Sequence, residues 1–144
     1  MRRSSLFIIP IAVSICLAQQ QPTAWDAPPE AKKLKNKVSL TGEKIDGVAM
    51  IYREKCVSCH GESGKSNVPA STTLAIEPAD LTNAKVMNKI KDGELFWKIS
   101  KGRPPMPGFE AGLSETDRWQ LVNYVRYLTK VSEYRYLGRR TPTR

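Results

Sequence analysis

The sequence predicts an all-α fold, in which several helices are joined by long loops. No stretch of the 144 residues shows the sustained polar–apolar alternation of a half-buried strand. Two segments, residues 41–56 and 114–131, instead carry apolar side chains at three- and four-residue spacing, which is typical of amphipathic helices. The 9 glycines and 10 prolines of the chain indicate much loop between the helices.

The first of these helices begins near Thr41, which can cap it, and its apolar face runs from Ile45 to Tyr52. It leads directly into Cys56-Val57-Ser58-Cys59-His60. Two cysteines at this spacing, followed at once by a histidine, form the pattern needed for covalent attachment of a c-type haem. The two thiols would form thioethers with the haem vinyl groups, and His60 would bind the iron.

Three other interpretations of this motif are less favoured. A structural zinc site needs four ligands, but His60 is the only histidine and, outside the N-terminal leader, Cys56 and Cys59 are the only cysteines. A thioredoxin-type dithiol needs a βαβ setting, which the pattern does not predict. A disulfide between residues so close in the chain would be strained. Haem attachment is therefore the prediction.

The second iron ligand is expected among the methionines, because a second histidine does not exist. Met50 precedes the motif too closely to reach the opposite side of a haem. Met87 falls in a short helical segment, where a core role is common. Met106 lies between Pro105 and Pro107, in a stiff loop far enough along the chain. Met106 is favoured, while Met87 and an open coordination position remain alternatives.

Between the motif and the last helix, residues 61–74 read as loop, and two short helices are expected at 84–91 and 94–101, separated by Asp92-Gly93. Phe96 and Ile99 share the apolar face of the second short helix, and we expect them to line the haem pocket. The last helix begins with a capping box of Ser114 and Asp117.

The two ends of the chain have a different composition. Residues 1–18 read as a secretory signal peptide, with lipidation of Cys16 as a less favoured alternative. Residues 19–40, rich in proline and lysine, are expected to form an extended linker or a strap across the domain. Trp25 is the one side chain there that could dock, as a surface contact rather than as part of a site. The domain itself would span 41–131, followed by a basic tail, 132–144.

These features together resemble class I c-type cytochromes of the bacterial periplasm, over residues 41–130. The resemblance implies one covalent haem, surrounded by helices of which the first and last cross near Tyr52 and Tyr124. It also implies that a proline after the motif, here Pro69, or the backbone beside it, holds the ring of His60. Gly47 departs from the pattern, because it lies one residue further from the aromatic side chain than is usual.

The resemblance implies an electron-transfer protein rather than an enzyme, with haem c as its cofactor. The expected function is that of a periplasmic one-electron carrier with His60 and Met106 as axial ligands, monomeric or part of a respiratory complex. Alternatives are a haem subunit or tethered domain of such a complex, and a five-coordinate sensor or peroxidase-like domain. The net charge of +9 favours redox partners with acidic surfaces over nucleic acid, and the mature chain would have no membrane span. Five basic residues could surround the haem edge: Lys55, Lys65, Lys98, Lys101 and Arg103.

Overall fold

The computed structural model describes residues 25–136, in which seven helices follow one another along the chain. They are α1 (Pro29–Lys33), α2 (Gly42–Lys55), α3 (Val57–His60), α4 (Pro69–Thr72), α5 (Ala84–Met87), α6 (Asp92–Lys101) and α7 (Glu115–Tyr136). Within this part of the chain, the β-type pairing is a single bridge between Arg103 and Met106. The all-α prediction is confirmed. None of the described helices is long and apolar enough to cross a bilayer.

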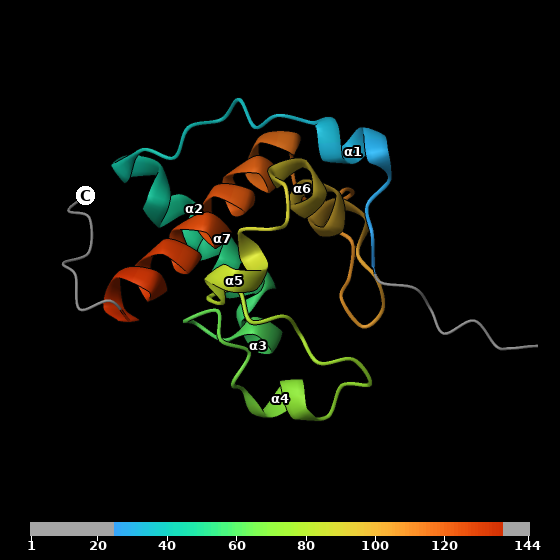
Figure 1. Ribbon diagram of the computed structural model, residues 1–144, viewed down its shortest axis with the longest axis vertical. Coiled ribbons are helices and arrows are strands. Elements are labelled where there is room, and N and C mark those ends of the chain that lie inside the picture. Colours follow the sequence, from blue (N-terminus) through green and yellow to red (C-terminus); the bar gives the residue numbers. More distant parts are fainter. Residues whose placement is uncertain (1–24, 137–144) are drawn as a thin grey trace, which may run out of the picture.

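The helices α2 and α7 cross at the centre of the molecule (Figure 1). Their contact buries Val48 and Tyr52 of α2 with Val125 of α7, and the ring of Tyr52 lies 5.1 Å from that of Tyr124. The predicted crossing of the first and last helices at these tyrosines is therefore confirmed. A Cβ atom at Gly47 would meet no atom within 4 Å, so Gly47 does not bring the two helices together.

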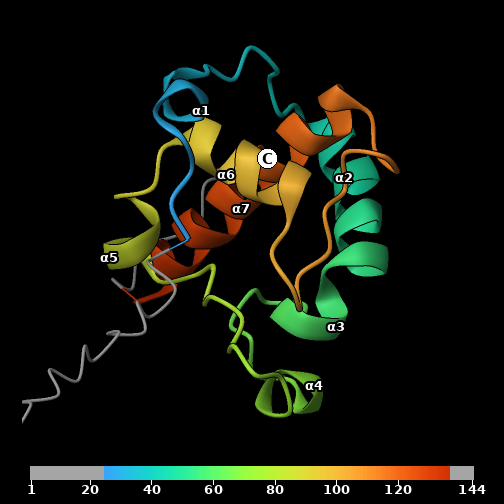
Figure 2. The ribbon, with the colours of Figure 1, turned by 90° about the vertical axis from the view of Figure 1, so that its right-hand side faces the viewer.

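The helices α6 and α5 pack on other parts of α7 and complete the core (Figure 2). Phe96 of α6 stacks on Trp119 at 4.0 Å, and Met87 at the end of α5 is almost fully buried. Further along the buried face of α7, the hydroxyl of Thr129 donates a hydrogen bond of 2.8 Å to the carbonyl of Leu81. The long helix thus serves as the common support of the elements that surround the haem motif.

The short helices differ from the prediction at one point. The helix predicted for 84–91 ends at Met87, and α6 begins at Asp92, so that Asp92 and Gly93 lie in its first turn rather than in a break. A glycine is required there because the backbone of α1 packs against it: a Cβ at Gly93 would lie 2.9 Å from the carbonyl oxygen of Leu34. Tertiary contact, rather than local propensity, therefore accounts for a glycine in the first turn of α6.

Residues 25–40, before α2, form a strap that lies on α6 and α7. It is not wholly extended, because Pro29, at the first helical position, begins the five-residue helix α1. Ala27 and Ala31 of this strap are buried. The expected signal peptide (1–18), Cys16 and residues 137–144 of the basic tail lie outside the described residues.

The ends of the two long helices can be compared with their predicted caps. Ser114 accepts a hydrogen bond of 3.1 Å from the backbone N–H of Asp117, so its capping role is confirmed. The Asp117 carboxylate accepts from the Ser114 hydroxyl at 2.6 Å, instead of from its backbone N–H as in a full capping box. Thr41 occupies the cap position of α2, but its side chain makes no capping hydrogen bond. The helix α7 continues to Tyr136, beyond the boundary predicted at residue 131.

Candidate haem site

The haem-attachment motif is positioned by the end of α2. Cys56 ends that helix with a hydrogen bond from its N–H to the carbonyl of Tyr52, and the backbone N–H groups of Cys59 and His60 then bond back to the carbonyl of Cys56. Gly61 stops the turn with φ of 72°, a conformation that favours glycine. Both cysteines are half-buried free thiols. A single compact turn therefore holds two thiols and the histidine against the same cavity.

The ring of His60 is oriented by a backbone acceptor. Its Nδ1 lies 3.1 Å from the carbonyl oxygen of Ala79, which also accepts a hydrogen bond of 2.8 Å from the hydroxyl of Ser66. Because a carbonyl can only accept, Nδ1 carries the proton and Nε2 keeps its lone pair for a metal. Burial lowers the pKa of His60, and the hydrogen bond to Ala79 opposes that effect. The neutral imidazole is the form that binds iron.

The loop that carries Met106 is tied down along its length. Arg103 and Met106 exchange two backbone hydrogen bonds, of 2.9 and 2.8 Å. Further on, the N–H of Phe109 bonds to the carbonyl of Ile99 at 3.0 Å. The close passage needs Gly108, because a Cβ there would lie 2.6 Å from the carbonyl oxygen of Lys101. The loop thus returns along the end of α6 and has little room to move.

A second anchor holds the same end of α6. Arg118, which is buried in α7, donates a hydrogen bond to the hydroxyl of Ser100, and its guanidinium lies 4.9 Å from the centre of the Phe96 ring. The hydroxyl of Ser100 in turn donates to the carbonyl of Phe96. These contacts connect the Met106 loop to the long helix that also supports α2. The two halves of the site are therefore held by one framework.

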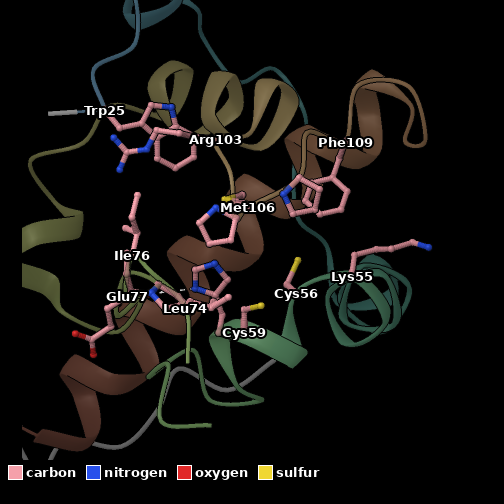
Figure 3. Close-up of a pocket in the computed structure, with 15 residues that line it drawn as sticks. Trp25, Lys55, Cys56, Cys59, Leu74, Ile76, Glu77, Arg103, Met106 and Phe109 are labelled. Atoms are coloured by element: carbon pink, nitrogen blue, oxygen red, sulfur yellow. Dashed lines mark hydrogen bonds between the residues drawn. The ribbon is translucent and has the colours of Figure 1, made fainter. Parts of the chain in front are cut away.

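Two adjoining cavities, of about 190 and 140 Å³, lie between the motif and the Met106 loop. Cys56, His60 and Met106 line both, and Cys59 lines the larger one. In Figure 3 the two cysteines lie on one side of the larger cavity and Met106 reaches into it from another side. The remaining lining is mainly apolar and includes Leu74, Ile76, Pro105, Pro107 and Phe109.

This set of donors fits a haem. The porphyrin itself supplies four nitrogen ligands, so the protein needs to offer only the axial groups, which in cytochromes c are a histidine and a methionine. Among the described residues, no three His, Cys, Asp or Glu side chains gather where they could hold a bare metal ion. Two thiols at the edge of an apolar cavity and an imidazole with a free Nε2 are what covalent haem binding requires.

Of the other residues predicted for the haem pocket, one lines a cavity and two do not. Ile99 lines the smaller cavity, as expected. Phe96 lines neither cavity, because its ring is used in the stack on Trp119. Pro69 is also misassigned: it is exposed, begins α4 and lines neither cavity. The backbone acceptor for His60 is Ala79, which follows Pro78, so a later proline marks that position.

Sequence reasoning missed one wall of the site. Trp25 lines both cavities, although it was expected to be a surface contact. Leu74 and Ile76, in the loop after α4, also line the larger cavity. An isolated aromatic residue in a proline-rich segment was the only sequence signal for Trp25. Nothing in the pattern of residues 61–80 distinguished the side chains that face the cavity.

The five basic residues expected around the haem edge do not form one group. Lys55 and Arg103 line the larger cavity. Lys98 pairs with Glu94 at 2.7 Å, and Lys101 pairs with Glu110 at 2.6 Å. The contact with Lys101 lowers the pKa of the Glu110 carboxyl. Lys65 is exposed and lines neither cavity. Lys98 also lines the smaller cavity, so three of the five basic residues line the site.

Comparison with known proteins identifies the family. No curated protein matches the chain. Residues 43–125, more than half of the sequence, match a family model described as cytochrome c oxidase, cbb3-type, subunit III. The match begins in α2 and ends in α7, and it includes the cysteine–histidine motif and the Met106 loop. With its two cysteines and its histidine on one cavity, this protein is a c-type cytochrome that binds haem covalently, and it belongs to the cytochrome c oxidase, cbb3-type, subunit III family.

Proposed function

We propose that this protein is a periplasmic one-electron carrier with a single haem c, whose iron is bound by His60 and Met106. The observation that carries the proposal is the cavity shared by Cys56, Cys59, His60 and Met106. When bound, the haem supplies the couple between ferric and ferrous iron, and Cys56 and Cys59 hold it through thioether bonds. An electron-transfer role, rather than catalysis, is what a cytochrome c domain implies.

The residues of this chain suit that role because hydrogen bonds within the protein fix their positions. The hydrogen bond from His60 to Ala79 fixes the ring, and the bridge between Arg103 and Met106 fixes the loop. Ligands that do not move between the two oxidation states keep the reorganisation energy small, which favours rapid electron transfer. A thioether ligand and apolar walls both favour the ferrous state and raise the reduction potential.

The ligand assignment is tested by comparing Met106→Ala with Met87→Ala in the haem-loaded full chain. A methionine sulfur bound to haem iron gives a weak absorption band at long wavelength. We expect Met106→Ala to lose this band and Met87→Ala to keep it. Met87 is the matched control, because it is a buried methionine that lines only the smaller cavity. Retention of the band in Met106→Ala would refute the assignment. Mass spectrometry of the same samples must show one covalent haem; absence of that added mass would refute the whole proposal.

The mouth of the cavity also supports a docking role. Lys55 is exposed at the end of α2 and Arg103 lies at the start of the Met106 loop, so anionic partners would be attracted to this side. Lys55→Glu should slow reduction of ferricyanide at low ionic strength, and the effect should vanish at high salt. Lys44→Glu is the matched control, because Lys44 is an exposed lysine at the opposite end of the same helix. Equal rates in both variants would exclude this docking side.

A second candidate is a haem subunit of a larger respiratory complex. The family description names an oxidase subunit, and this observation favours the candidate. Size-exclusion chromatography of a native extract, followed by haem staining, separates the two. A haem band at the size of the single chain supports the free carrier. A band that elutes only with a much larger assembly supports the subunit.

A further inference from the structure

The strap, residues 25–40, is attached to α7 by a reciprocal set of side-chain hydrogen bonds. The Asn36 amide donates to the side-chain oxygen of Asn123 at 2.8 Å, and Asn123 donates to the carbonyl of Val38 at 2.8 Å. Gln120 adds a longer bond, of 3.3 Å, to the carbonyl of Ser39. Because these bonds join residues more than eighty positions apart, they determine where the strap lies on the domain.

The helix α1, which lies within the strap, packs closely on α6. The backbone of Ala31 and Leu34 contacts Gly93 so closely that no Cβ atom could be accommodated there. Ala31 itself is 5% exposed. The strap therefore has a defined seat on α6 and on α7, and the side chain at its beginning is held in one place.

That side chain is Trp25, which lines both cavities of the haem site. The guanidinium carbon of Arg103 lies 5.1 Å from the centre of its ring, and the Lys98 amine lies 5.5 Å away. In Figure 3 the ring of Trp25 and the guanidinium of Arg103 lie together beyond Met106. Cations at this distance from an indole ring are attracted to its face.

Arg103 connects this contact to the iron ligand. It exchanges both of its backbone hydrogen-bonding groups with Met106, so a displacement of Arg103 must also displace the methionine. A series of contacts thus connects the strap, through Trp25 and Arg103, to Met106. Residues 43–125, which define the family match, do not include the first step of this series.

We propose that Trp25 is a positioning residue for Met106: the strap presses the indole against Arg103 and thereby holds the methionine loop closed over the haem. The inference rests on the proposed ligation of iron by His60 and Met106. Removal of the indole leaves the loop without one of its supports and opens the Met106 side of the cavity to water. The loop then opens more often, and an external ligand competes more easily with the thioether.

The test is the affinity of imidazole for the ferric, haem-loaded full chain, measured by optical titration. Trp25→Ala should raise that affinity between about two- and thirty-fold, the range that corresponds to one cation–π contact. It should also lower the reduction potential, since water is admitted. Trp25→Phe keeps an aromatic face and should restore most of the wild-type affinity. Leu34→Ala, at an exposed side chain of the same strap, should leave the affinity unchanged.

Two further variants test the inference independently of whether Trp25→Ala folds. Arg103→Gln removes the cation but keeps the indole and the backbone bridge, so it should raise imidazole affinity even if Trp25→Ala fails to fold. The double variant of Trp25 and Arg103 should add little to either single change, because both remove the same contact. Fully additive effects, or wild-type affinity in Trp25→Ala or in Arg103→Gln, would overturn the inference.

Met106→Ala separates this inference from the assignment on which it rests. If Met106→Ala binds imidazole tightly and Trp25→Ala behaves as wild type, Met106 is the ligand and Trp25 does not position it. If Met106→Ala itself retains the wild-type affinity and spectrum, the ligand assignment fails, and the role of Trp25 fails with it. If both variants bind imidazole more tightly and Trp25→Phe does not, both statements stand.

Discussion

Replacement of Tyr52 by phenylalanine tests how the crossing of α2 and α7 supports the haem motif. Tyr52 is 2% exposed, and its hydroxyl donates a hydrogen bond of 2.9 Å to the carbonyl of Gly61. Gly61 is the residue immediately after His60, at the turn where the motif ends. The change keeps the ring and its contact with Tyr124, so it removes only the hydroxyl and its bond.

The expected loss of stability arises because the carbonyl of Gly61 loses its hydrogen-bond donor. A buried acceptor that is left without its donor destabilises a protein by roughly 1–3 kcal/mol. For a domain of this size, 1 kcal/mol shifts the melting temperature by about 4 °C, so we expect a decrease of roughly 4–12 °C. The measurement is thermal unfolding of the haem-loaded protein by circular dichroism, supported by the urea midpoint at unchanged m-value.

The matched control is Tyr127→Phe. Tyr127 lies on the same helix as Tyr124, is only half-buried, and its hydroxyl has no hydrogen-bond partner among the described residues. Its replacement should cost no more than about 0.5 kcal/mol of stability, so the melting temperature should stay close to that of the wild type. A melting temperature of Tyr52→Phe equal to that of Tyr127→Phe would refute the reasoning, because the hydrogen bond to Gly61 would then contribute nothing.

The remaining predictions concern the pH dependence of stability, the buried side chain of Met87 and the half-buried side chain of Arg126. Burial raises the pKa of the Tyr52 phenol above its ordinary value, so its contribution to stability is full below about pH 10 and is lost as pH rises through the raised value. Urea midpoints above pH 10 should fall more steeply in the wild type than in Tyr52→Phe; parallel curves would contradict this. Met87→Ala should lower the free energy of unfolding in urea by about 2–5 kcal/mol, because the Met87 side chain is 1% exposed and its removal leaves a cavity in the core. A loss below about 1 kcal/mol would contradict this, because the core would then have closed the new cavity. Arg126→Gln should cost about 1–3 kcal/mol in the same assay, since the guanidinium bonds both to Asp92 at 2.8 Å and to the carbonyl of Met87 at 2.6 Å; an unchanged midpoint would contradict it.

The parts of the site that could be predicted from sequence are those that depend on local chemistry. The spacing of Cys56, Cys59 and His60 is fixed by a covalent reaction, so it is visible in five consecutive residues. The cap at Ser114 is visible for the same reason, because its partners are three residues apart. The prediction of Met106 as the second ligand depends on a count of methionines and on two flanking prolines, and it stays a prediction.

The parts that sequence reasoning missed depend on contacts between distant segments. The pattern around Asp92 and Gly93 reads as a helix break, since glycine is a poor helix former. In the folded chain the pair lies in the first turn of α6. Glycine is needed there because the backbone of α1 occupies the space that a side chain would need. The acceptor for His60 was expected at Pro69 or the backbone beside it, but Ala79 supplies it. The loop between the two positions has no periodicity from which its path could be derived.

Trp25 illustrates the same limit and has a functional consequence. A domain boundary at residue 41 is reasonable from composition, and the family match begins at residue 43. Yet a wall of both cavities is supplied by a residue before that boundary. The cation–π contact with Arg103 then makes the strap part of the environment of Met106. Two proteins with the same motif and the same methionine loop can therefore differ in how readily the methionine leaves the iron, according to what their N-terminal segments bring to the cavity. In this chain, that difference depends on a single indole ring.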